Sequence, residues 1–185
     1  MEKEKTGAKA RTQSYIGDAL ISLMKERDYA DITICELCEK AGVSRSTFYR
    51  SFTDKESVMA SYLDRTISEF IAVKGPVPDD ENDMYNYIFS ILGNTYKYKE
   101  IIKSMWSSSL CFTLLNILSN VFVRSFPDRE TTKNLYSKYP LLPYAYSGML
   151  YNIMLRWVLE DCKESIAEVA DTLFLAIYGH EHRRI

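Results

Sequence analysis

The stretch ITICELCEKAGVSRSTFYRSFTDKESV, residues 32–58, contains two short amphipathic runs separated by a single glycine. Thr33 stands three residues before Glu36, which is the spacing of a capping box and predicts that a helix begins there. Gly42 can adopt the left-handed backbone that a tight turn requires. Ser44 then predicts the cap of a second short helix. Two short helices joined by a glycine turn form a helix-turn-helix.

The second short helix offers hydrogen-bond donors and no carboxylates. No acidic residue occurs from Ser44 to Thr53, although the whole chain has a net charge of −2. Arg45 and Lys55 both lie in the first turn of a predicted helix, where a cation interacts unfavourably with the helix dipole. A cation at that place can, however, bind an anion together with the free backbone amides of the first turn. Because the second helix of such a motif can enter the major groove, we predict that the segment binds DNA. The alternative is that both cations are solvated surface residues. The donors are Ser44, Arg45, Ser46, Thr47, Tyr49 and Arg50.

Composition indicates a globular protein. The chain has 185 residues, of which 46% are hydrophobic and 26% charged. The N-terminal segment lacks the apolar region of a secretory signal, so we expect a cytoplasmic protein. The most apolar segment, 141–159, is interrupted by Pro143 and Arg156, which favours a buried helix over a membrane span. Cys35 and Cys38 have C-x-x-C spacing but no second pair follows, so we expect reduced thiols, no metal and no cofactor.

The hydrophobic periodicity predicts an all-α fold. Thr53 and Glu56 have the spacing of a second capping box, and no alternating strand pattern occurs. The segment 74–80, which contains glycine and proline, is the clearest boundary. We expect a DNA-binding domain of three helices at 1–53, a connecting helix at 54–74 and a helical domain for dimerisation and effector binding at 75–185. The expected helices are about 8–27, 33–40, 44–50, 53–73, 82–93, 97–104, 107–125, 143–160 and 165–179.

The stretch from Thr33 to Val58 resembles the DNA-binding segment of TetR-family transcriptional regulators. The resemblance rests on the threonine that opens the second helix, the Ala-Gly-Val-Ser turn at 41–44, the Phe-Tyr pair at 48–49, and a phenylalanine at 52 followed by Lys-Glu at 55–56. The chain departs from the pattern at Cys38, where the family usually has a small alanine. A thiol is also small enough for that position.

The resemblance implies roles for individual residues. Thr33, Tyr49 and Lys55 would contact phosphates, and Arg45, Ser46 and Thr47 would face base edges. Arginine is the residue that most often reads guanine, so we expect Arg45 to determine specificity. Arg50 would contact either a base or a phosphate.

The last two predicted helices are expected to form a homodimer. A single short helix-turn-helix contacts few base pairs, and a two-fold operator requires a two-fold protein. The region also resembles the C-terminal region of a short TetR subgroup, with Gly148 near the start and Trp157 late in the penultimate helix. The apolar positions expected at the interface are Met149, Ile153, Met154, Trp157, Ile166, Val169, Leu173 and Ile177.

We therefore expect a TetR-type regulator that binds a palindromic double-stranded DNA operator as a homodimer. We expect a repressor released by a small-molecule effector; the alternative is an activator or adaptor controlled by a protein partner. The ligand-binding residues are unknown, because aromatic residues at helical spacing form cores more often than pockets. An enzyme is not expected, since no Ser-His-Asp set or glycine-rich phosphate loop occurs and both histidines lie near residue 180.

Overall fold

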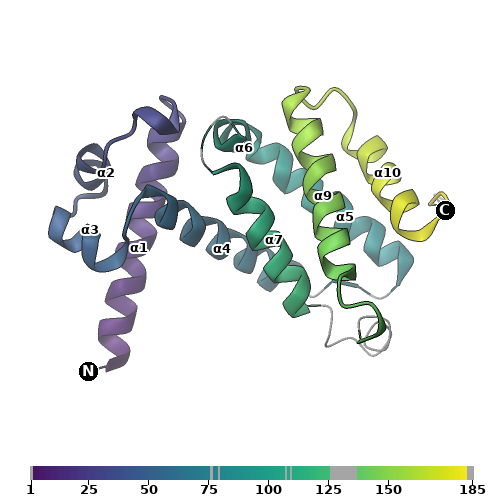
Figure 1. Cartoon of the computed structure of the whole chain (residues 1–185), viewed down its shortest axis with the longest axis horizontal. Helices are drawn as coiled ribbons and strands as arrows, with labels where there is room; N and C mark the ends of the chain where they lie inside the picture. The colour runs from purple at the N-terminus through teal and green to yellow at the C-terminus, as the bar shows by residue number, and fades with distance from the viewer. Residues whose placement is uncertain are drawn as a thin grey trace. The chain divides into compact units, whose positions relative to one another are not determined.

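A computed structural model describes residues 2–75, 77–78, 80–106, 108, 110–125 and 137–182 (Figure 1). Every regular element in these ranges is a helix, which confirms the predicted all-α fold. Backbone contacts divide the chain into two compact units. The first comprises Met1–Glu69 and Ser104–Thr113, and the second comprises Phe70–Lys103 and Leu114–Ile185.

The first unit contains the segment that the sequence singled out. Within it, α1 contacts α2 and α3, and α2 contacts α3. Ile16 and Leu20 of α1 are fully buried, as are Leu37 of α2 and Phe48 of α3. The helices are α1 (Glu2–Met24), the 3-10 helix η1 (Tyr29–Asp31), α2 (Ile34–Ala41), α3 (Arg45–Ser51) and α4 (Lys55–Lys74).

The predicted caps of α2 and α3 are confirmed. The Glu36 amide donates to the Thr33 hydroxyl at 3.2 Å, and the Thr33 amide donates to the Glu36 carboxylate at 3.0 Å. Gly42 ends α2 with a φ of 67°, a left-handed conformation that costs glycine little. The Ser44 hydroxyl accepts a hydrogen bond from the Thr47 amide at 3.1 Å. Each of these features depends on residues close together in the sequence.

The predicted capping box of Thr53 and Glu56 is wrong. The Asp54 carboxylate accepts from the Ser57 amide at 2.7 Å, and the Ser57 hydroxyl accepts from the Asp54 amide at 3.3 Å. Aspartate is at least as good an N-cap as threonine, so the reciprocal pair forms one residue later. Lys55 is therefore the first residue of α4.

The second unit is built around three mutually contacting helices, α5, α9 and α10 (Figure 1). Helix α5 continues past the expected end at residue 93, because Gly93 lies within it without ending it. Ser165 and Glu168 form a capping box at the start of α10. The helices are α5 (Glu81–Lys97), α6 (Lys99–Trp106), α7 (Cys111–Ser125), α9 (Leu142–Leu159) and α10 (Ile166–Tyr178).

Half of the residues expected at a dimer interface are in the core of this unit instead. The exposed fractions of Met154, Trp157, Val169 and Leu173 are 6%, 4%, 6% and 1%. Their side chains form one cluster with residues of α5, including Leu92. A second protomer cannot reach them, so their assignment to the interface is corrected. The other four, which are partly buried around the same cluster, are Met149, Ile153, Ile166 and Ile177.

Neither a helix that could cross a membrane nor a metal-binding cluster occurs in the part of the chain that the structure describes. No helix there combines the length and apolar character that crossing a membrane requires. No group of three or more His, Cys, Asp or Glu side chains in the same residues is arranged to hold a metal ion. Cys35 and Cys38 are free thiols; Cys35 is exposed, and burial raises the pKa of Cys38.

Candidate nucleic-acid interface

Helix α3 has one buried side and one exposed side. Phe48 is fully buried, and its ring lies 6.1 Å from that of Phe52, which is also buried. Tyr49 is 51% exposed and packs edge-on against Phe48, with ring centroids 5.3 Å apart. The two phenylalanines therefore anchor the helix as the sequence predicts. The exposed side chains are those of Arg45, Ser46, Tyr49 and Arg50.

Arg45 and Tyr49 form a pair on the exposed side of α3. Arg45 is the first residue of α3 and Tyr49 lies four positions later, so the two side chains share one face of the helix. The interaction with Tyr49 raises the pKa of Arg45 above its ordinary value. The pair therefore presents a cation and a neutral donor together.

A second set of hydrogen-bonded side chains runs along α3 from its N-cap. The hydroxyls of Ser44 and Thr47 are 2.9 Å apart, and Arg50 donates to the Thr47 hydroxyl at 3.0 Å. Thr47 is accordingly less exposed than Ser46 and Arg50. Arg50 lies against its own helix in this arrangement, with its side chain still on the exposed side. Arg45 and Arg50 thus lie on one short helix that has no carboxylate.

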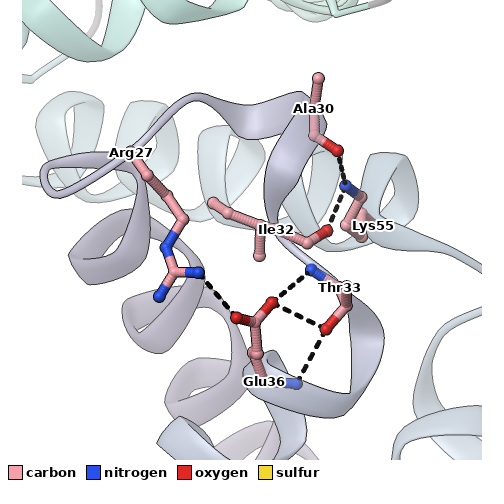
Figure 2. A network of polar contacts seen from close by, with 6 residues as sticks. All are labelled: Arg27, Ala30, Ile32, Thr33, Glu36 and Lys55. Atoms are coloured by element: carbon pink, nitrogen blue, oxygen red, sulfur yellow. Dashed lines mark hydrogen bonds and ion pairs between the residues drawn. The ribbon is translucent and has the colours of Figure 1, made fainter.

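The side chain of Lys55 points into the protein rather than outward. Its ammonium donates to the carbonyl of Tyr29 at 2.9 Å. It also donates to the carbonyl of Ala30 at 3.5 Å and to that of Ile32 (Figure 2). The nitrogen also lies 4.5 Å from the centroid of the Tyr29 ring. An ammonium has three hydrogens, and all three have acceptors here. The phosphate contact predicted for Lys55 stays a prediction, and the structure gives its ammonium acceptors within the protein.

Thr33 is also held by internal contacts. Its hydroxyl donates to the Glu36 carboxylate at 2.7 Å, and a hydroxyl has only one hydrogen to donate. Arg27 donates to the other oxygen of the same carboxylate at 2.6 Å (Figure 2). In this arrangement Thr33 has no hydrogen left for a phosphate. The structure thus gives Thr33 a role in capping α2, and its phosphate contact stays a prediction.

Sequence reasoning missed two parts of this network. Arg27 pairs with a residue nine positions away, a separation with no local signature. The 3-10 helix at Tyr29–Asp31 was not predicted. The carbonyls of Tyr29 and of Ile32, which follows this helix, become acceptors for Lys55, and Ile32 is 23 positions from Lys55. No spacing rule predicts such a contact, because it arises from packing.

We expect the cap of α2 to give the protein a pH-dependent stability. The amide and hydroxyl of Thr33, followed by Arg27, donate to the Glu36 carboxylate and lower its pKa from 4.5 to about 2. A lowered pKa stabilises the fold fully above about pH 4.5, and this contribution is lost as the pH falls towards 2. Glu36→Gln should therefore lower the melting temperature at pH 7, and the deficit should shrink between pH 4.5 and 2.

Thermal melting followed by circular dichroism at several pH values measures this effect. Glu39→Gln, which changes an exposed carboxylate on the same helix, is the matched control and should melt like the parent. A deficit for Glu36→Gln that stays constant from pH 7 to pH 2 would remove the carboxylate from the cap.

Family and structure comparisons agree with the geometry of the first unit. Residues 16–62 match the family described as bacterial regulatory proteins, tetR family. The HTH-type transcriptional regulator EthR of Mycobacterium tuberculosis is 30% identical over 80 residues, which cover 40% of this chain and 37% of that protein. The uncharacterized HTH-type transcriptional regulator YxbF of Bacillus subtilis is 26% identical over 130 residues, covering 70% of this chain and 29% of that protein. The chain thus spans well under half the length of the curated relatives that it matches.

Two solved structures share the fold over nearly the whole chain. The fatty acid degradation regulator FadR from Bacillus halodurans matches with a TM-score of 0.57 and 21% identity, covering 93% of this chain and 97% of that one. A TetR transcriptional regulator from Rhodococcus sp. RHA1 matches with a TM-score of 0.59 and 13% identity, covering 92% and 99%. The fold and the exposed basic helix define a helix-turn-helix protein. The family match places residues 16–62 among the helix-turn-helix segments of the bacterial regulatory proteins of the tetR family.

Proposed function

We propose that the chain binds a palindromic operator as a homodimer, with one copy of α3 in each of two major grooves, and represses transcription until a small molecule releases it. The observation that carries the proposal is the exposed side of α3. It presents Arg45, Ser46, Tyr49 and Arg50 with no carboxylate between Ser44 and Thr53. Positive side chains without neighbouring acids are what phosphate and guanine contacts require.

The homodimer is proposed through the outer sides of α9 and α10. Four of the predicted interface residues are buried within the protomer, so a partner would contact those left partly accessible, which include Met149 and Ile153. Leu175 of α10 is 46% exposed and adds a large apolar side chain. Apolar side chains left accessible on adjoining helices are typical of surfaces that a second copy covers.

Effector release is proposed from the family resemblance. Some aromatic residues between α4 and the end of α9 lie in the core and others lie on the surface. Tyr87 and Tyr151 are buried, whereas Phe112 is 67% exposed. One surface hollow of the second unit has a volume of about 510 Å³ and is lined by Asp171, Thr172, Leu175, Glu181 and His182. Saturable binding of a small apolar compound that weakens the DNA complex would favour a ligand over a protein partner.

Selection of bound DNA from a random pool tests the central proposal. We expect an enriched motif with two-fold symmetry and half-site centres about 34–36 Å apart, so that both copies of α3 face the same side of the duplex. The double variant Arg45→Ala, Arg50→Ala is the control, because both side chains are exposed and their loss leaves the core intact. Enrichment of a motif without symmetry, or the same motif from the double variant, would contradict the proposal.

A further inference from the structure

Lys55 joins the beginning of the helix-turn-helix to its end. The carbonyls that it binds belong to η1 and to Ile32, which directly precedes the cap of α2. Lys55 itself is the first residue of α4, four positions after the end of α3. The bond between Lys55 and the Ile32 carbonyl (Figure 2) thus joins positions 23 apart in the sequence, and both helices of the motif lie between them.

The surroundings of Lys55 suit a compact cation held in one place. Burial lowers its pKa, and the negative charges of Asp31, Glu56 and Glu36 act in the opposite direction. An ammonium directs three hydrogens to converging acceptors, whereas the planar guanidinium of arginine cannot reproduce that arrangement. The Tyr29 ring covers the cation as well. Lysine thus adds a donor to the carbonyls of this turn, of which that of Tyr29 also accepts from the Ile32 amide at 3.3 Å.

We propose that Lys55 is a positioning residue for DNA recognition, one that fixes the angle of α2 and α3 by closing the helix-turn-helix, and that it is not a phosphate contact. The inference rests on the proposed DNA binding. In this role Lys55 acts through the placement of α3, which carries Arg45, and never touches DNA itself.

Three roles of Lys55 give different results for binding. A phosphate contact weakens binding to all sequences alike and contributes about 0.9 to the slope of log affinity against log salt. A positioning residue weakens binding to the operator more than binding to unrelated DNA, because non-specific binding is mainly electrostatic. A residue that serves only stability changes the melting temperature and leaves both affinities of the folded protein unchanged.

Lys55→Met and Lys55→Arg, each in the full chain, separate these roles. Both variants should lose at least about tenfold in operator affinity. A hydrogen bond to a charged group favours the conformation that contains it by roughly that factor in the equilibrium constant. Affinity for unrelated DNA should stay within about twofold, with an unchanged salt slope. Arginine would preserve a phosphate contact, so its failure to rescue operator binding is the decisive result. Lys40→Met, which removes an exposed cation of α2, is the matched control and should leave the operator preference intact.

Binding is measured at a temperature where circular dichroism shows each variant folded. A uniform loss with a flatter salt slope, rescue by Lys55→Arg, or a change in melting temperature alone would each overturn the inference. If the parent chain binds no DNA, the proposed function fails separately. In that case, hydrogen exchange at the amides of Asp31, Ile32 and Thr33 tests whether Lys55 holds this turn in place. Loss of the ammonium in Lys55→Met should speed their exchange by about tenfold or more. Unchanged exchange in Lys55→Met would also overturn it.

Discussion

Leu173→Asp is expected to unfold the second unit rather than to separate two protomers. Leu173 is 1% exposed and packs in the cluster shared by α5, α9 and α10. A carboxylate there would be buried without a partner, which costs on the order of 4 kcal/mol or more. Because a domain is stable by only about 5–15 kcal/mol, most of its stability would be lost. Urea unfolding followed by circular dichroism measures the effect.

Ile153→Asp is the matched comparison for the proposed interface. Ile153 lies on α9 at the edge of the same cluster, where a charged side chain can reach water. We expect this variant to keep the helical signal and to sediment as a monomer. A Leu173→Asp chain that melts like the parent would place Leu173 outside the core. An Ile153→Asp chain that stays dimeric would remove that position from the interface.

Helix α9 illustrates what hydrophobic periodicity can and cannot predict. The sequence of α9 is apolar on more than one face, and the spacing alone identifies both faces without saying which one meets the protomer's own core. Trp157 is buried within its own unit, and its indole N–H donates to the Glu164 carbonyl at 2.9 Å. That contact depends on the turn after α9. The assignment of such residues to a partner therefore required the packed structure.

The helix-turn-helix was more predictable because its determinants are local. Thr33 with Glu36, Gly42, and Ser44 with Thr47 all act within a few residues, and each was read correctly from spacing. The internal contacts of Lys55 were not predicted, because its acceptors lie 23 to 26 residues away on and just after a 3-10 helix without a signature. A cation in the first turn of a helix indicates that an anion or a dipole compensates it, and here the compensating groups are the protein's own carbonyls.

Arg45→Ala is expected to relax specificity at one symmetric pair of operator positions. The guanidinium is exposed at the first turn of α3, where a recognition helix contacts bases. A bidentate contact with guanine is worth about 1–3 kcal/mol of discrimination, so the two copies in a dimer should lose roughly 2–6 kcal/mol together. Titrations against operators substituted at each position measure this loss. A loss spread evenly over all positions would instead make Arg45 a phosphate contact.

Tyr49→Phe sharpens that experiment, because the phenol lies one helical turn from Arg45 and raises the pKa of its guanidinium. If Tyr49 only donated to a phosphate, loss of its hydroxyl would weaken binding to every sequence alike, as the sequence predicts. The proximity to Arg45 adds a second consequence, since a guanidinium without that polar neighbour is less restricted in orientation. We therefore expect a uniform loss and, in addition, a smaller loss at the same pair of positions that Arg45→Ala affects. In the Arg45→Ala background the second component should vanish, because no guanidinium remains to be oriented. Additive effects of the two substitutions at those positions would show that Tyr49 does not position Arg45.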